Sequence, residues 1–179
     1  TPIAATIVSE KVMQPIEEGS GSVMSGHTFS ANPLSCAVAG AVIDYIEKNK
    51  VMEKVETKGQ YLRKALERLQ VAFPFIGDVR GKGLLLGLEF VQDAAGKTPF
   101  SRSLFFTKQM VETAQRHGLL LYPAQAGIDG VEGDAVIIAP PLTITNDEMD
   151  ELLNRLKRTL TDMQEYILMK GEGYGKSLS

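Results

Sequence analysis

The chain has 179 residues, 44% of them hydrophobic and 23% charged, which is ordinary usage for about one globular domain and excludes a disordered or collagen-like chain. The formal charge of −3 comes from interspersed acidic and basic residues, so we expect no nucleic-acid partner, and since no apolar run reaches the roughly 18 residues of a membrane span, no membrane partner either. The single cysteine, Cys36, excludes an internal disulfide and fits a reducing compartment, so we expect a cytoplasmic protein.

The residues before position 50 predict a strand, a loop and a long helix, in that order. Residues 2–9 form a short β-branched run, which is typical of a strand covered on both faces. Residues 17–26 are rich in glycine and serine and predict a loop. Asn32 as N-cap and Pro33 as first helical residue predict a helix that continues to Lys48. Because the first three turns of this helix are apolar on every side, we expect them to be buried.

A lone strand cannot bury itself, so residues 2–9 are expected to complete a sheet that is made elsewhere. The chain also begins at Thr1 without an initiator methionine. We therefore expect a processed chain or a fragment that lacks an N-terminal portion.

From Val51 onward the pattern predicts an α+β domain. A helix that starts at Val51 has one apolar stripe and one charged face. Residues 77–91 are expected to form two strands or one bent strand, with Gly87 at a close backbone approach. The run GKG at 81–83 superficially resembles a phosphate loop, but it lacks the strand-to-helix setting, so we interpret it as a turn between strands.

The last part of the chain predicts a helix, two strands and a long final helix. The first of these helices ends at Gly118, after basic residues in its last turn. Strands are expected at 119–122 and 135–139, with a loop at 124–134 between them. Thr145 opens a capping box for the final helix, and the glycine-rich residues after 170 are expected to form a frayed tail.

The segment from Ser25 to Ser30 is the main candidate for chemistry. Hydroxyl groups, an imidazole and backbone amides gather here just before a helix N-terminus, where the amides and the helix dipole favour an anion. A hydroxyl of Thr28 or Ser30 could therefore cap the helix or bind a phosphate, and the residues alone leave both alternatives open. His117, at a helix C-terminus, and Cys36, on an apolar helix face, are interpreted as structural. Two histidines and one cysteine do not supply the spacing of a metal site.

Three stretches resemble the class III (omega-amino acid type) aminotransferases, which are pyridoxal phosphate enzymes of fold type I. They are GHTFSANPLSCAVA at 26–39, VRGKGLLLGLE at 79–89 and IAPPLTIT at 138–145, and they occur in the family's order and spacing. The opening TPIAATIVS at 1–9 is also similar to the strand that follows the family's lysine-bearing turn. The resemblance therefore covers essentially the whole chain.

For the fold, the resemblance implies an α/β parent of fold type I. Residues 1–50 would be the end of the large cofactor-binding domain, with the helix at 32–48 leading to the small domain. Residues 51–170 would be that small α+β C-terminal domain, and 171–179 would be a tail. The family also implies a homodimer or a dimer-based oligomer.

For the site, the resemblance implies that Thr28 binds the phosphate of pyridoxal 5′-phosphate through its hydroxyl and backbone N–H, across the dimer in the neighbouring subunit. His27 and Ser25 occupy positions that face the substrate in related enzymes. The intact enzyme would use the cofactor as an electron sink to transfer an amino group between an amine or ω-amino acid and a 2-oxo acid. The family's Schiff-base lysine would lie before Thr1, so no catalytic residue is expected in this chain and the isolated chain would be inactive.

The sequence departs from the family pattern where the substrate carboxylate binds. Many relatives carry an arginine just before the Pro-Pro segment, and residues 130–139 contain none. This favours a parent enzyme that accepts donors without an α-carboxylate. Two alternatives stay open: a class III aminomutase or decarboxylase, and a freestanding α+β binding module that lacks the catalytic half.

Overall fold

The computed structural model describes residues 1–124 and 133–171. They belong to two units, one of residues Thr1–Lys50 and one that starts at Val51. Each unit is described by itself. None of the described helices is long and apolar enough to cross a membrane.

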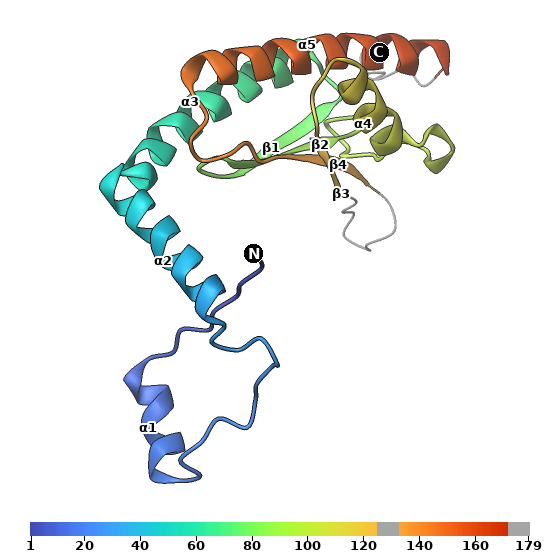
Figure 1. Cartoon of the computed structure of the whole chain (residues 1–179). Coiled ribbons are helices and arrows are strands. Elements are labelled where there is room, and N and C mark those ends of the chain that lie inside the picture. The colour runs from blue at the N-terminus through green and yellow to red at the C-terminus, as the bar shows by residue number, and fades with distance from the viewer. Residues whose placement is uncertain (125–132, 172–179) are drawn as a thin grey trace. The chain divides into compact units, whose positions relative to one another are not determined.

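The first unit contains two helices, α1 (Glu10–Glu18) and α2 (Pro33–Lys48) (Figure 1). The strand expected at 2–9 is not formed within this chain, where these residues have no regular structure and are exposed. A strand needs a neighbour to take up its backbone hydrogen bonds, and residues 2–9 pair with no described strand. The sequence interpretation also missed α1, although Ser9 followed by the acidic Glu10 is a common helix start.

Helix α2 starts as predicted, because the Asn32 side chain accepts a hydrogen bond from the Ser35 amide at 3.1 Å and Pro33 is the first helical residue. Its expected burial is not found, since no residue of α2 is buried. An apolar helix surface is buried only where other residues pack against it, and the described residues do not pack against α2 in this way.

The second unit is built on a four-stranded antiparallel sheet in the order β1-β2-β4-β3. The strands are β1 (Ile76–Lys82), β2 (Leu85–Phe90), β3 (Tyr122–Ala124) and β4 (Asp134–Ile138). The two strands allowed for residues 77–91 are thus confirmed. The turn between them is formed by Gly83 and Leu84, so it includes only the last residue of the GKG run, and Gly81 and Lys82 belong to β1. The register pairs Leu88 with Val79 on one side and with Val136 on the other.

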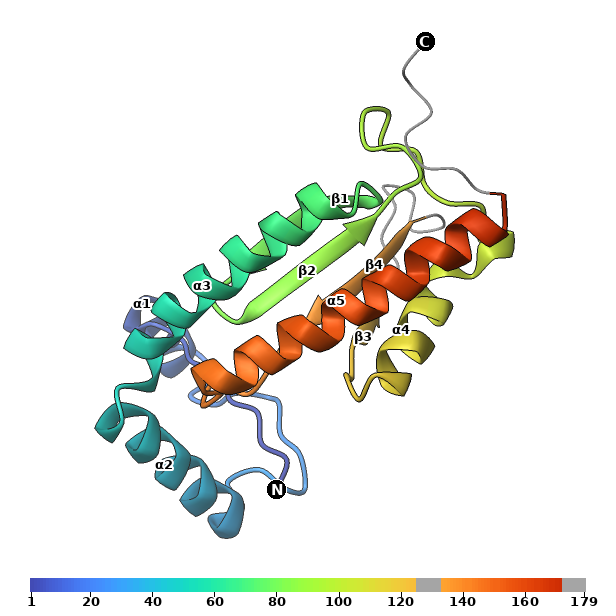
Figure 2. The ribbon, with the colours of Figure 1, turned by 90° about the horizontal axis from the view of Figure 1, so that it is seen from above.

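Helices α3 (Val51–Ala72), α4 (Phe106–Arg116) and α5 (Asn146–Met169) cover one face of this sheet (Figure 2). Alternate residues of β2 point to that face and are buried, whereas Leu85 on the other face is 60% exposed. The capping box of α5 forms as predicted, with Thr145 and Glu148 bonded to each other's backbone amides. The core under the helices is aromatic in part, with ring contacts among Phe73, Phe75, Phe90, Phe100 and Phe106.

The strands near the end of the chain are displaced from their expected positions. The strand expected at 119–122 begins only at Tyr122, because the Leu119 amide donates to the Ala114 carbonyl oxygen of α4 and is not free to pair with a strand. The predicted helix stop is confirmed, since Gly118 has φ +73°. The loop expected at 124–134 and the tail expected at 171–179 lie largely outside the described residues.

The close backbone approach expected at Gly87 is wrong. A Cβ atom added there would meet nothing nearer than the Val136 carbonyl oxygen at 3.7 Å, which is ordinary contact. The close approach instead involves Gly59 of α3, where an added Cβ would lie 2.5 Å from the Gly83 carbonyl oxygen. Gly59 therefore lets helix α3 rest directly on the β1–β2 turn.

Candidate functional site

Residues 27–32 form two consecutive turns directly before α2. The Ser30 amide donates to the His27 carbonyl oxygen at 2.8 Å, and the Asn32 amide donates to the Phe29 carbonyl oxygen at 3.2 Å. In the reverse direction, the His27 amide donates to the Ser30 hydroxyl oxygen at 2.9 Å. Ala31, in the second turn, has φ +54°, a left-handed conformation that is uncommon for a residue with a side chain.

Thr28 lies between the two bonded residues of the first turn and is exposed. Within residues 1–124 and 133–171, neither its hydroxyl nor its amide has a hydrogen-bond partner. The helix is capped by Asn32 instead, and the Ser30 hydroxyl is bonded to His27. The helix-cap alternative for Thr28 and Ser30 is therefore wrong, and the structure leaves Thr28 with two unused donors.

The other two candidates are close to Thr28 in the chain. His27 belongs to the same turn, Ser25 precedes it by two residues, and both are exposed. No hydrogen bond of the described residues involves the His27 ring or the Ser25 hydroxyl. The three side chains are thus available to a ligand.

The donor set at Thr28 has the chemistry that a phosphate group requires. A phosphate monoester carries close to two negative charges and accepts hydrogen bonds through its oxygens. Thr28 offers a hydroxyl and an amide, and residues 19–43 contain no Asp or Glu that would repel an anion. The residues therefore fit the phosphate of pyridoxal 5′-phosphate.

A lysine that reacts with an aldehyde has to be deprotonated, which requires burial or a neighbouring cation. The chain has twelve lysines, and none of those among the described residues is buried. Lys176 lies outside the described residues. The described part of the chain thus supplies phosphate donors and no buried lysine.

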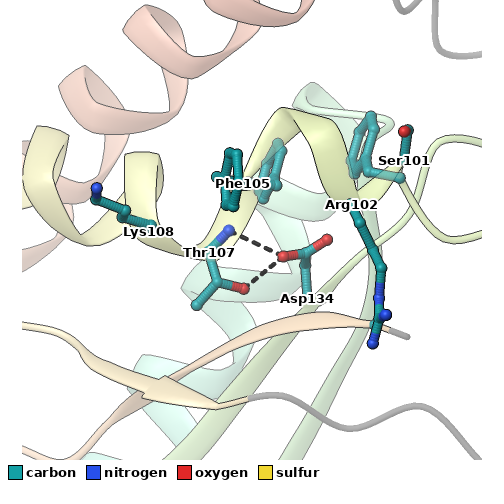
Figure 3. A pocket seen from close by; sticks show the side chains of 9 residues that line it. Ser101, Arg102, Phe105, Thr107, Lys108 and Asp134 are labelled. Atoms are coloured by element: carbon teal, nitrogen blue, oxygen red, sulfur yellow. Dashed lines mark hydrogen bonds between the residues drawn. The ribbon is translucent and has the colours of Figure 1, made fainter. Parts of the chain in front are cut away.

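The second unit contains a cavity of about 360 Å³ at the start of α4. The Asp134 carboxylate at the end of β4 accepts hydrogen bonds from the Thr107 amide at 2.9 Å and from the Thr107 hydroxyl at 2.6 Å (Figure 3). Arg102 and Lys108 also line the cavity. Asp134 thus takes up an amide of the first turn of α4 and ties the helix to the sheet. The contact joins residues far apart in the sequence, so no local pattern predicts it.

Two residues interpreted as structural behave differently from each other. His117 caps α4, and its Nε2 lies 2.8 Å from an Asp162 carboxylate oxygen of α5, so it joins two helices as a structural residue does. Cys36 was expected on a buried helix face and is exposed. Cys36 is exposed because none of the described residues packs against its face of α2.

Comparison with known proteins identifies the family. Residues 1–160 match the sequence profile of the family described as Aminotransferase class-III. The chain belongs to this family. Class III aminotransferases depend on pyridoxal phosphate, and the fold is that of part of a fold type I transferase.

Individual relatives agree with this assignment. An uncharacterized aminotransferase of Bacillus subtilis, YodT, is 45% identical over 164 residues, which cover 92% of this chain and 37% of the relative. A leucine/methionine racemase of Thermococcus litoralis is 32% identical and is covered to 34%. The crystal structure of an (S)-enantioselective omega-transaminase from Thermomicrobium roseum superposes with a TM-score of 0.76 at 31% identity, with 87% of this chain and 33% of that chain covered. The chain therefore spans about a third of the length of the relatives it matches.

Proposed function

We propose that this chain is the C-terminal part of a pyridoxal-phosphate-dependent aminotransferase and that Thr28 binds the cofactor phosphate. The observation that carries the proposal is the pair of unused donors on Thr28, in an exposed turn of a chain that belongs to the class-III family. Bound there, the cofactor supplies the electron sink for amino-group transfer. His27 and Ser25 contact the substrate.

The first unit belongs to the large cofactor-binding domain, with α2 as the helix that leads to the small domain, and the second unit is the small domain. The support for this is the division of the chain between Lys50 and Val51. The protein is a homodimer, or an oligomer of dimers, in which Thr28 serves the cofactor of the neighbouring subunit. Its location is cytoplasmic, which rests on the single cysteine.

The substrates are an amine or ω-amino acid as donor and a 2-oxo acid as acceptor. A donor with an α-carboxylate needs a cation to hold that group, most effectively the fork of an arginine. Residues 130–139 contain no arginine, and the charged group of β4 is the carboxylate of Asp134, which is bonded to Thr107 of α4. Turnover of simple amines by the full-length protein supports this substrate class, and strict use of α-amino acids contradicts it.

The experiment that tests the phosphate role is the substitution Thr28→Ala in the full-length protein, with Thr28→Ser as the matched control that keeps the hydroxyl. A hydrogen bond to a charged group contributes about 1.5–3 kcal/mol, so we expect the cofactor to bind roughly ten- to a hundredfold more weakly in Thr28→Ala. Thr28→Ser should retain most of the affinity. Equal affinity in all three proteins would remove Thr28 from the site.

The similarity to a leucine/methionine racemase favours a second candidate, a reaction in which no amino group leaves the substrate. The two candidate reactions, amino-group transfer and racemisation, give different products. An aminotransferase converts a 2-oxo acid into an amino acid, whereas a racemase needs no 2-oxo acid and returns the opposite enantiomer of its substrate. Chiral analysis of the reaction mixture with and without a 2-oxo acid distinguishes them.

A further inference from the structure

The turn that carries Thr28 is closed by the side chain of Ser30. The Ser30 hydroxyl oxygen accepts a hydrogen bond from the His27 amide at 2.9 Å. The Ser30 amide donates to the His27 carbonyl oxygen at 2.8 Å. Two bonds between the same two residues restrain both the distance across the turn and its twist, whereas either bond alone restrains less.

Other described contacts give this turn little support. Residues 25–31 are exposed, so no packed core holds their backbone. Asn32 fixes the far end of the segment, because its side chain accepts from Ser35 and its amide donates to the Phe29 carbonyl oxygen. Among residues 25–28, the hydrogen bonds that the structure describes are those of His27 with Ser30.

We propose that Ser30 is a positioning residue: its hydroxyl holds the turn so that the hydroxyl and amide of Thr28 form a pre-arranged pair of phosphate donors. The inference rests on the proposed function, in which Thr28 binds the cofactor phosphate. A loop that is already ordered loses less conformational freedom when a ligand binds. Ser30 therefore raises cofactor affinity without contacting the cofactor.

The test uses the full-length protein and a pair of substitutions that differ in the hydrogen-bond acceptor, Ser30→Thr and Ser30→Val. Both add a branched side chain of similar shape, and threonine alone keeps the hydroxyl. Ser20→Ala is a control for the loss of a serine hydroxyl elsewhere, since Ser20 makes a similar local bond to the Ser22 carbonyl oxygen at 3.0 Å. The readouts are the dissociation constant of pyridoxal phosphate, from its visible absorbance band, and the inhibition of cofactor binding by inorganic phosphate.

We expect Ser30→Val to weaken cofactor and inorganic phosphate binding three- to tenfold, and Ser30→Thr and Ser20→Ala to stay within twofold of the unchanged protein. Combined with Thr28→Ala, Ser30→Val should weaken binding less than it does in the parent, because one of the two donors that it arranges, the Thr28 hydroxyl, is gone. The thermal midpoint of each variant without cofactor shows that it is folded. If Ser30→Val does not fold, Ser30→Ala takes its place in the same comparison.

If Thr28→Ala weakens cofactor binding, either of two results would overturn the positioning role of Ser30. One is a Ser30→Val protein with unchanged affinity, and the other is a Ser30→Val effect of equal size with and without the Thr28 hydroxyl. An unchanged affinity in Thr28→Ala is a different result, which contradicts the proposed function itself. The two failures are therefore distinguishable.

Discussion

Gly59→Ala tests the packing of helix α3 on the β1–β2 turn. In an exposed helix this change stabilises by up to about 1 kcal/mol. At Gly59 the new Cβ would lie 2.5 Å from the carbonyl oxygen and 2.6 Å from the Cα of Gly83. These are backbone atoms of a turn in which Gly83 has φ +56°, so they cannot move without displacing the strands.

Overpacking costs about 1–3 kcal/mol, and a clash with backbone atoms belongs to the upper part of that range, about 2–3 kcal/mol. After the gain of about 1 kcal/mol in helix propensity, we expect a net loss of about 1–2 kcal/mol in the free energy of unfolding. With a urea dependence of about 2 kcal/mol/M, the unfolding midpoint should fall by about 0.5–1 M. Urea unfolding followed by far-ultraviolet circular dichroism measures it. Gly87→Ala is the matched control in the same unit, since its Cβ has room, and its midpoint should not fall. A Gly59→Ala protein as stable as the parent would refute the contact.

Three further predictions concern other contacts. Asp134→Ala removes the carboxylate that accepts two hydrogen bonds from Thr107 in the first turn of α4. The change should lower the free energy of unfolding, measured by urea unfolding, by about 1–2 kcal/mol, and no change would show that these bonds do not hold the helix. Hydrogen bonds from the Thr145 amide and hydroxyl lower the pKa of Glu148. The ionised Glu148 side chain therefore stabilises the fold above the ordinary glutamate pKa, and this stabilisation is lost as the pH falls through the lowered pKa. Glu148→Gln should reduce the loss of stability between about pH 5 and pH 3, and an acid unfolding profile identical to that of the parent would contradict this. Borohydride treatment of this chain with pyridoxal phosphate should give no stoichiometric adduct at one lysine, because no described lysine is buried; a single modified lysine found by peptide mass mapping would show otherwise.

The sequence predicted those parts of the fold that depend on neighbouring residues. The Asn32-Pro33 start of α2, the capping box at Thr145 and the stop at Gly118 are each set by a few adjacent residues. The strand expected at 2–9 is not formed within this chain, because a strand needs a partner and no described strand pairs with these residues.

Contacts between distant residues could not be predicted for the same reason. Gly59 and Gly83 lie 24 positions apart in the sequence, and Thr107 and Asp134 lie 27 apart. Both contacts depend on how the sheet is assembled. The glycine within an apolar run predicts a close backbone approach at Gly87, but a side chain has room there.

The candidate site was found from sequence because hydroxyls and an imidazole precede a helix start, and the family resemblance selected Thr28 among them. The residues alone could not decide between a cap and an anion site, since any of several hydroxyls can reach the same amides. The structure removes the cap alternative by assigning Asn32 to α2 and the Ser30 hydroxyl to His27. That assignment leaves the donors of Thr28 unused.

The most direct test of the central proposal is to mix two inactive full-length variants, Thr28→Ala and one whose cofactor-binding lysine is replaced, at limiting cofactor. If Thr28 serves the neighbouring subunit, each mixed dimer contains one site with both groups intact. Random exchange of subunits in a two-fold dimer should then restore about a quarter of the parent activity. If mixed dimers form and no activity returns, Thr28 does not act across the dimer and the account is contradicted.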